Sequence, residues 1–94
     1  MVKLQKASNL ALSIDSTSAE VIPANERRKF LTIVNGSDVG IWLGFGEAAV
    51  VGEGVYLVSA GGAYNITPQN LWCGSIHAIT ASGDNKVAGA VEFQ

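Results

Sequence analysis

Residues 29–35, Lys29-Phe30-Leu31-Thr32-Ile33-Val34-Asn35, followed at once by Gly36-Ser37-Asp38, decide the fold class. β-Branched and aromatic residues dominate this stretch, as is typical of strands. Phe30, Thr32 and Val34 alternate with Leu31 and Ile33, so the two sets face opposite sides of a sheet. Asn-Gly is a strong hairpin signal, because both residues tolerate a positive φ. We therefore predict a strand over residues 29–35 and an antiparallel return over residues 39–45.

The same strand pattern recurs along the whole chain. Further strands are expected around Leu10, Leu12 and Ile14 and over residues 19–22, 55–59, 63–67, 75–81 and 86–93. Ser82-Gly83-Asp84-Asn85 predicts a second tight hairpin between the last two, and Val87, Val91 and Phe93 share one face of the final strand. About eight short strands separated by turns predict an all-β domain, a single antiparallel β-sandwich or jelly-roll-like barrel of residues 8–94. We expect residues 1–7 to form a flexible N-terminal arm.

Composition indicates that this domain is completed by neighbours. The 94 residues are 48% hydrophobic and only 15% charged, against roughly 25% charged in an average soluble domain. Between Val39 and Gly83 the only charged residues are Glu47 and Glu53. A domain this small has a thin core, so part of the apolar surface is expected to be buried against other subunits.

Charge and cysteine usage exclude several classes of partner and location. A net charge of −2 creates no strong field toward nucleic acid or anionic lipid, so neither is an expected partner. The single Cys73 cannot form an internal disulfide, which favours assembly in a reducing cytosol. No secretory signal and no apolar run of membrane-spanning length occurs, so no membrane association is expected.

No residue set predicts catalysis, a cofactor or a metal. Residues 44–49, Gly44-Phe45-Gly46-Glu47-Ala48-Ala49, match the dinucleotide fingerprint, but Gly52 and Gly54 interrupt the helix that it requires. One histidine, His77, and one cysteine cannot build a conventional zinc site, and no acid nearby in sequence orients His77 as a base. We therefore predict that the chain is not an enzyme and binds no cofactor.

The candidate interface residues are two arginines and three aromatic residues. Arg27 and Arg28 belong to the basic cluster Glu26-Arg27-Arg28-Lys29, which is either a polar turn or a source of inter-subunit salt bridges or phosphate contacts. Trp42 is flanked by apolar residues and is expected in the core or an interface. Tyr64 and Trp72 could stack against carbohydrate, with packing against another subunit as the stronger interpretation.

Four motifs span about residues 20 to 91. They are Val21-Ile22-Pro23-Ala24-Asn25 with Arg28-Lys29-Phe30-Leu31-Thr32-Ile33-Val34-Asn35; Ile41-Trp42-Leu43-Gly44-Phe45-Gly46; Gly54, Leu57, Gly61 and Tyr64; and Ile76-His77-Ala78-Ile79-Thr80-Ala81-Ser82-Gly83. Together they resemble the small β-structured virion proteins of tailed bacteriophages. Residues 1 to 20 match nothing in that pattern, so their role stays open.

The resemblance implies a structural component of a phage particle. The expected function is a capsid decoration or cement protein that binds the outside of the major capsid protein lattice as a homotrimer and stabilises the head. It would be assembled in the host cytoplasm and located on the capsid surface of the virion. A tail, neck or fibre-associated virion protein is the alternative, and a carbohydrate-binding or adhesion module on the particle is a third reading.

Overall fold

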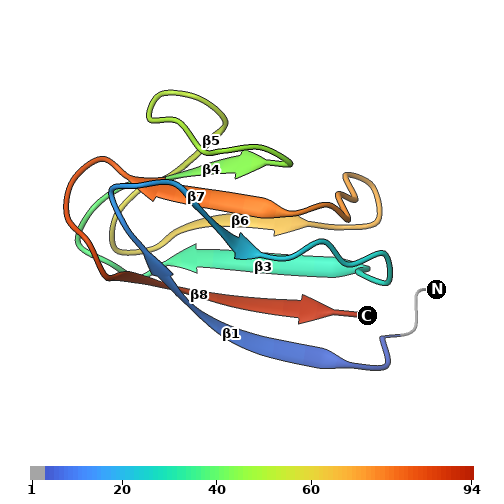
Figure 1. Cartoon of the computed structure of the whole chain (residues 1–94). Coiled ribbons are helices and arrows are strands. Elements are labelled where there is room, and N and C mark those ends of the chain that lie inside the picture. The colour runs from blue at the N-terminus through green and yellow to red at the C-terminus, as the bar shows by residue number, and fades with distance from the viewer. Residues whose placement is uncertain (1–3) are drawn as a thin grey trace.

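Residues 4–94, which the computed structural model describes, form eight strands in two four-stranded antiparallel sheets (Figure 1). The strands are β1 (Ala7–Ile14), β2 (Ala19–Ile22), β3 (Phe30–Asn35), β4 (Ile41–Phe45), β5 (Val55–Leu57), β6 (Gly62–Ile66), β7 (Ile76–Thr80) and β8 (Lys86–Phe93). No helix occurs in this part of the chain. The predicted all-β sandwich is confirmed.

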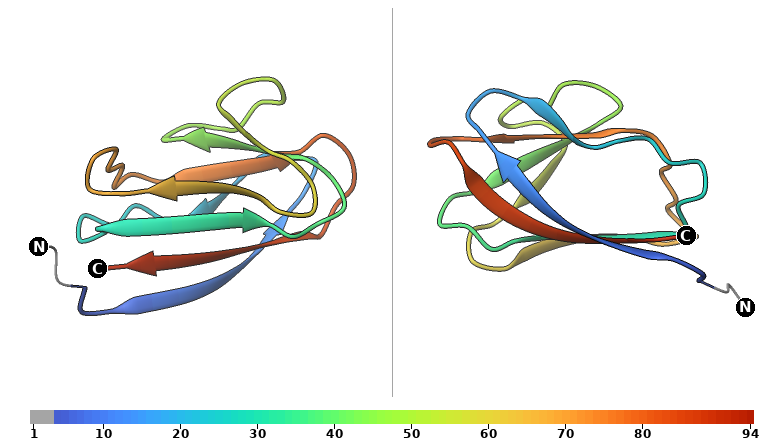
Figure 2. Two further views of the ribbon diagram at one scale, coloured as in Figure 1. Left: turned by 180° about the vertical axis from the view of Figure 1, so that it is seen from behind. Right: turned by 60° about the horizontal axis from the view of Figure 1, so that its bottom comes forward.

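The strand order is that of a jelly roll. One sheet has the order β1-β8-β3-β6 and the other β2-β7-β4-β5. The pairs β1–β8, β2–β7, β3–β6 and β4–β5 are those of one long hairpin that reverses at the β4–β5 turn. Rolling this hairpin on itself adds the pairs β3–β8 and β4–β7 and separates the strands into two packed layers (Figure 2).

The hairpin predicted at Asn35-Gly36 is wrong. β3 and β4 belong to different sheets, and Gly36 is not among the residues with positive φ. Asn35 is fully buried, and its Nδ2 donates to the carbonyl oxygens of Val39 and Leu57 at 2.8 and 3.0 Å. Its Oδ1 accepts from the backbone N–H of Ser37 at 3.0 Å. The side chain therefore directs the chain across the sandwich instead of back along the same sheet.

The hairpin predicted over residues 82–85 is wrong for a related reason. β7 and β8 also lie in different sheets. The backbone N–H of Asn85 donates to Asp15 Oδ1 at 2.8 Å, and the backbone N–H of Ser16 donates to Asp84 Oδ1 at 2.9 Å. This connection thus packs against the β1–β2 connection, and contacts between residues about 70 apart in sequence override the local turn signal.

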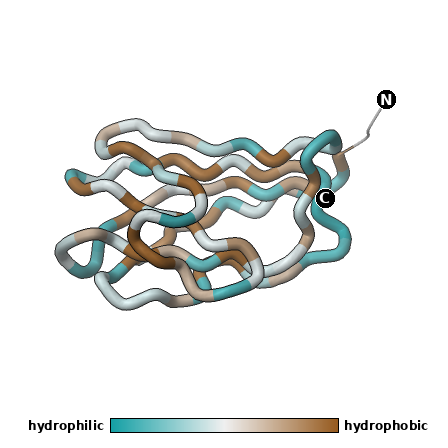
Figure 3. Tube along the Cα trace, turned by 90° about the horizontal axis from the view of Figure 1, so that it is seen from above, coloured by the Kyte–Doolittle hydropathy of each residue, from teal (hydrophilic) through white to brown (hydrophobic). Residues whose placement is uncertain are grey.

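The core lies between the inner faces of the two sheets. It consists of large aliphatic residues and two alanines: Leu12, Ile14, Ile22, Leu31, Ile33, Ile41, Leu43, Leu57, Ile66, Ile76, Ala78 and Ala88. Burying each large aliphatic side chain contributes about 1.5–3 kcal/mol. The alternation predicted for residues 29–35 is confirmed, because Leu31 and Ile33 point inward. Hydrophilic segments gather mainly in the loops, including those near the C-terminus (Figure 3).

The two ends of the chain lie side by side. The backbone N–H groups of Gln5 and Lys6 donate to the carbonyl oxygen of Gln94 at 2.7 and 2.8 Å. In return, the N–H of Gln94 donates to the carbonyl oxygen of Lys6 at 2.9 Å. Of the predicted arm over residues 1–7, residues 1–3 lie outside the described residues. The remainder of that segment leads into β1 beside the end of β8.

Candidate interaction surfaces

The outer face of the β1-β8-β3-β6 sheet carries no charged residue. Its members alternate with the core residues along each strand, and the strand register places them beside one another. They are Ala7, Asn9, Ala11 and Ser13 on β1; Val87, Gly89, Val91 and Phe93 on β8; Phe30, Thr32 and Val34 on β3; and Ala63 and Asn65 on β6. We call this set the uncharged face.

The uncharged face exposes apolar side chains to solvent. Val34 and Val87 are 39% and 55% exposed. A Cβ added to Gly89 would meet no atom within 4 Å, so this position opens onto the space above the sheet. Two polar side chains of the face bind each other, because the Thr32 hydroxyl donates a hydrogen bond to Asn65 Oδ1 at 2.9 Å. Contiguous apolar surface of this kind marks contact sites in soluble proteins.

The large residues of β8 point away from the core. Val87, Val91 and Phe93 share one face, as expected from their spacing, and that face is the outer one. The core side of the same strand holds Ala88. The alternation of β8 therefore showed which residues share a face. The usual pattern places the large apolar residues inward, whereas here the small residues point inward and the large ones outward.

Trp42 and Tyr56 lie on the outer face of the other sheet. They are directly paired across β4 and β5, with ring centroids 4.8 Å apart and planes inclined by 45°. Tyr56 is 50% exposed, and the other neighbour of Trp42 is Ile79 on β7. Trp42 is thus a surface residue and not part of the core. Because the two rings are inclined, they do not offer one flat surface for a sugar ring.

Tyr64 and Trp72 both pack on Phe45, at centroid distances of 5.6 and 6.5 Å. Tyr64 is half-buried against the core from the inner side of β6. Trp72 is 38% exposed, and its Nε1 donates to the carbonyl oxygen of Ser75 at 3.0 Å. The structure therefore brings the two predicted aromatic residues together, but as a packing cluster around Phe45 in which only Trp72 is well exposed.

Arg28, expected among the interface residues, is instead a buried structural residue. It is 1% exposed, and its Nε donates to Glu92 Oε2 at 2.6 Å. Its Nη1 donates to the carbonyl oxygens of Trp72 and Gly74 at 2.8 and 3.0 Å, and its Nη2 to that of Pro23 at 2.9 Å. We call this arrangement the Arg28 clamp. All of these contacts lie within the chain, so the guanidinium does not reach a partner.

Two residues of the motifs on which the expected resemblance rests, Asn25 and Gly54, lie at corners of the fold. Asn25 extends the Arg28 clamp, because its Nδ2 donates to Glu92 Oε1 at 3.0 Å and to Gln94 Oε1 at 2.7 Å. Gly54 has φ +83° and lies so close to the Leu43 carbonyl oxygen that a Cβ would clash with it. These positions are constrained by the fold itself, so the resemblance bears on fold more directly than on a binding surface.

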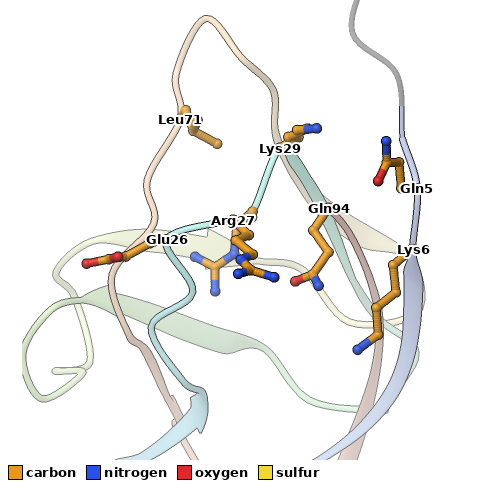
Figure 4. Close-up of a pocket in the computed structure, with 8 residues that line it drawn as sticks. Gln5, Lys6, Glu26, Arg27, Lys29, Leu71 and Gln94 are labelled. Atoms are coloured by element: carbon orange, nitrogen blue, oxygen red, sulfur yellow. The ribbon is translucent and has the colours of Figure 1, made fainter.

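Arg27, next to the clamp, borders a surface pocket of about 550 Å³ (Figure 4). The pocket lies where the start of the chain, the β2–β3 connection, the β6–β7 connection and the C-terminus meet. It is lined by Gln5, Lys6, Glu26, Arg27, Arg28, Lys29, Leu71 and Gln94. We call it the basic pocket. Of the five predicted interface residues, Arg27 and Arg28 line this pocket, and Arg27 is the exposed one of the two.

The opposite end of the sandwich is acidic. Lys86 Nζ donates to Asp38 Oδ1 at 2.8 Å, and this hydrogen bond lowers the pKa of Asp38. The backbone N–H and hydroxyl of Ser16 donate to Asp84, and they lower the pKa of Asp84. A lowered pKa means that the stabilisation is present at neutral pH and lost as the pH falls through the lowered value. Both aspartates thus remain ionised under ordinary conditions.

His77 and Cys73 are the residues considered for chemistry. His77 Nε2 lies 3.4 Å from the Ser75 hydroxyl, and Cys73 Sγ donates to the Arg28 carbonyl oxygen at 3.7 Å. Residues 46–54 form turns without a helix, so the fingerprint at residues 44–49 lacks the helix N-terminus that holds a pyrophosphate. Within residues 4–94, no group of three or more His, Cys, Asp or Glu side chains is arranged to hold a metal ion. The same residues contain no helix able to cross a membrane.

A comparison with protein-family models gives no match, and neither does a comparison with curated proteins.

We predict that Arg28→Met destabilises the protein far more than Arg27→Met. Losing Arg28 leaves Glu92 as a buried, unpaired carboxylate together with three carbonyl oxygens without a donor, which costs about 3–5 kcal/mol. Arg27 is exposed, so its replacement changes the free energy of unfolding by about 0.5 kcal/mol or less. Urea unfolding followed by tryptophan fluorescence measures both variants. Equal effects of the two substitutions would contradict the assignment.

Proposed function

We propose that the chain is a non-enzymatic structural protein of a tailed-phage particle. In this proposal it binds the outside of the major capsid lattice as a homo-oligomer, for which the resemblance implies a trimer, and stabilises the head. Stabilisation then follows from mass action, since a protein that binds only the closed shell lowers the free energy of that shell relative to its open states. A tail, neck or fibre-associated role with the same fold is the alternative.

The uncharged face is the observation that supports this proposal most strongly. A protein that works alone in solution gains solubility from charged residues on its outer faces. Here every outward position of four neighbouring strands is uncharged, and several carry Val or Phe. Such a face is kept out of water most effectively by a protein neighbour, as in the interfaces of permanent assemblies.

We propose that a second copy covers the uncharged face. The four strands contain 8, 8, 6 and 5 residues, and at about 3.3 Å per residue and about 4.8 Å between strands they cover roughly 430 Å². Two such faces together cover roughly 860 Å², the size of a small interface.

The fold and the resemblance support the same class of function. Some positions of the motifs expected for phage virion proteins belong to the Arg28 clamp and the glycine corners, which are positions that a common fold would keep. Carbohydrate binding has less support, because Tyr64 faces the core and the Trp42–Tyr56 pair is inclined. The proposal therefore assigns the function to protein contacts.

We predict that Gly89→Arg weakens self-association by at least about 100-fold, because burying an unpaired charge costs several kcal/mol. The substitution leaves the fold intact, since a Cβ at this position meets nothing within 4 Å. Gly36→Arg is the matched control, because its Cβ also meets nothing and it lies in an end connection. Sedimentation velocity compares the two variants with the unaltered chain. The same mass for both variants would exclude the uncharged face as the contact.

We predict that particles lacking the protein open at a lower temperature than complete particles. Heating both in the presence of a DNA-binding dye measures the opening temperature, and adding back the purified protein should restore it. The Gly36→Arg protein should restore it as well. An unchanged opening temperature would contradict the head-stabilising role, and only a few copies per particle on a stained gel would favour a tail location.

A further inference from the structure

We infer that the basic pocket binds a carboxylate group from an acidic segment of a protein partner. This inference rests on the proposed function in one respect, since the partner that it fits is the shell protein underneath. The site itself is defined by Lys6, Arg27, Lys29, Gln5, Gln94 and Leu71. It lies at the end of the sandwich where the two chain ends meet, at the rim of the uncharged face.

Two cations at this pocket, Lys6 and Arg27, are not matched by acids among residues 4–94. The salt bridges given for these residues join Arg28 to Glu92 and Lys86 to Asp38. Lys6 and Arg27 have no ion pair, although the chain has more acidic than basic residues. The nearest acid along the chain, Glu26, points away from Arg27 (Figure 4). An excess of positive charge is therefore left facing one pocket.

The pocket is built by rigid parts of the fold. Arg27 immediately precedes the buried Arg28, so the clamp fixes the backbone from which its side chain projects. Asn25 also fixes it, because the Arg27 backbone N–H donates to Asn25 Oδ1 at 3.0 Å. Lys6 is held by two backbone hydrogen bonds with Gln94. The backbone thus holds cations and amides from three chain segments close together before a ligand binds. Binding then costs less conformational entropy.

The lining fits a carboxylate carried on a short aliphatic stem. The guanidinium of Arg27 can hold both oxygens of a carboxylate, Lys6 adds a second charge, and the amides of Gln5 and Gln94 add neutral donors. Leu71 provides an apolar wall for the stem. Figure 4 shows the ends of Gln94 and Lys6 beside one another in the lower part of the pocket.

A protein carboxylate fits better than nucleic acid. Binding a duplex requires a track of cations along many phosphates, whereas here the positive charge is confined to one pocket on a chain of net charge −2. At the far end of the sandwich, Lys86 is already paired with Asp38, so it offers an extended polyanion no second contact. A single acidic segment needs only the pocket itself.

The test is a titration of the ¹⁵N-labelled chain with a capped pentaglutamate peptide, followed by amide chemical shifts. Inorganic phosphate and a short DNA duplex form separate arms of the experiment. We expect the largest shifts at Lys6, Arg27 and Lys29, and weaker binding at higher salt. The double variant Lys6→Gln/Arg27→Gln should bind at least about tenfold more weakly. The control Lys86→Gln, which removes a cation at the other end, should bind like the unaltered chain.

Three results would overturn the inference. They are no shifts at millimolar peptide, shifts that the double variant leaves unchanged, and tighter binding of phosphate or DNA at the same residues. The test does not depend on the shell, because it uses only the purified chain and a peptide. Peptide binding combined with an unchanged opening temperature of particles would therefore reject the head-stabilising role and retain the pocket.

Discussion

The buried guanidinium of Arg28 is the interaction on which this end of the sandwich depends. It joins the β2–β3 connection to the β6–β7 connection and to Glu92 of β8, all within 3.0 Å. A buried charge is tolerated only when it is paired and fully hydrogen-bonded. The clamp meets that requirement and thereby fixes the positions of both the basic pocket above it and the C-terminal strand beside it.

Local alternation made the strands predictable and showed which residues share a face, whereas the pairing of the strands was not predictable. Leu31 and Ile33 lie together on one face, opposite Val34, and the final strand begins and ends where the sequence indicates. Both predicted hairpins were wrong. A turn motif reflects the preferences of four consecutive residues, whereas the direction of the chain after each turn is set by contacts with residues far away in sequence. Asn35, for example, is held by Leu57, which lies 22 positions further along the chain.

The candidate site was predictable only in part for the same reason. Nothing in Arg27-Arg28 indicates which of the two is buried, since the acceptors of Arg28 lie up to 64 residues away. The β8 pattern identified Val87, Val91 and Phe93 as one face, but periodicity does not say which face meets the core. That depends on how much space the opposite sheet leaves, and here the inward positions hold the small residues Ala88 and Ala90.

Residues that hold the fold and residues of the candidate contact surfaces are separated in this small protein. The clamp and the glycine corners hold the jelly roll, while the uncharged face and the basic pocket lie on its outside. The central claim is that a second copy covers the uncharged face. Sedimentation equilibrium of the unaltered chain over a range of concentrations tests it most directly. The account predicts a mass of at least twice the 9.8 kDa of one chain, and a monomer at every concentration would contradict it.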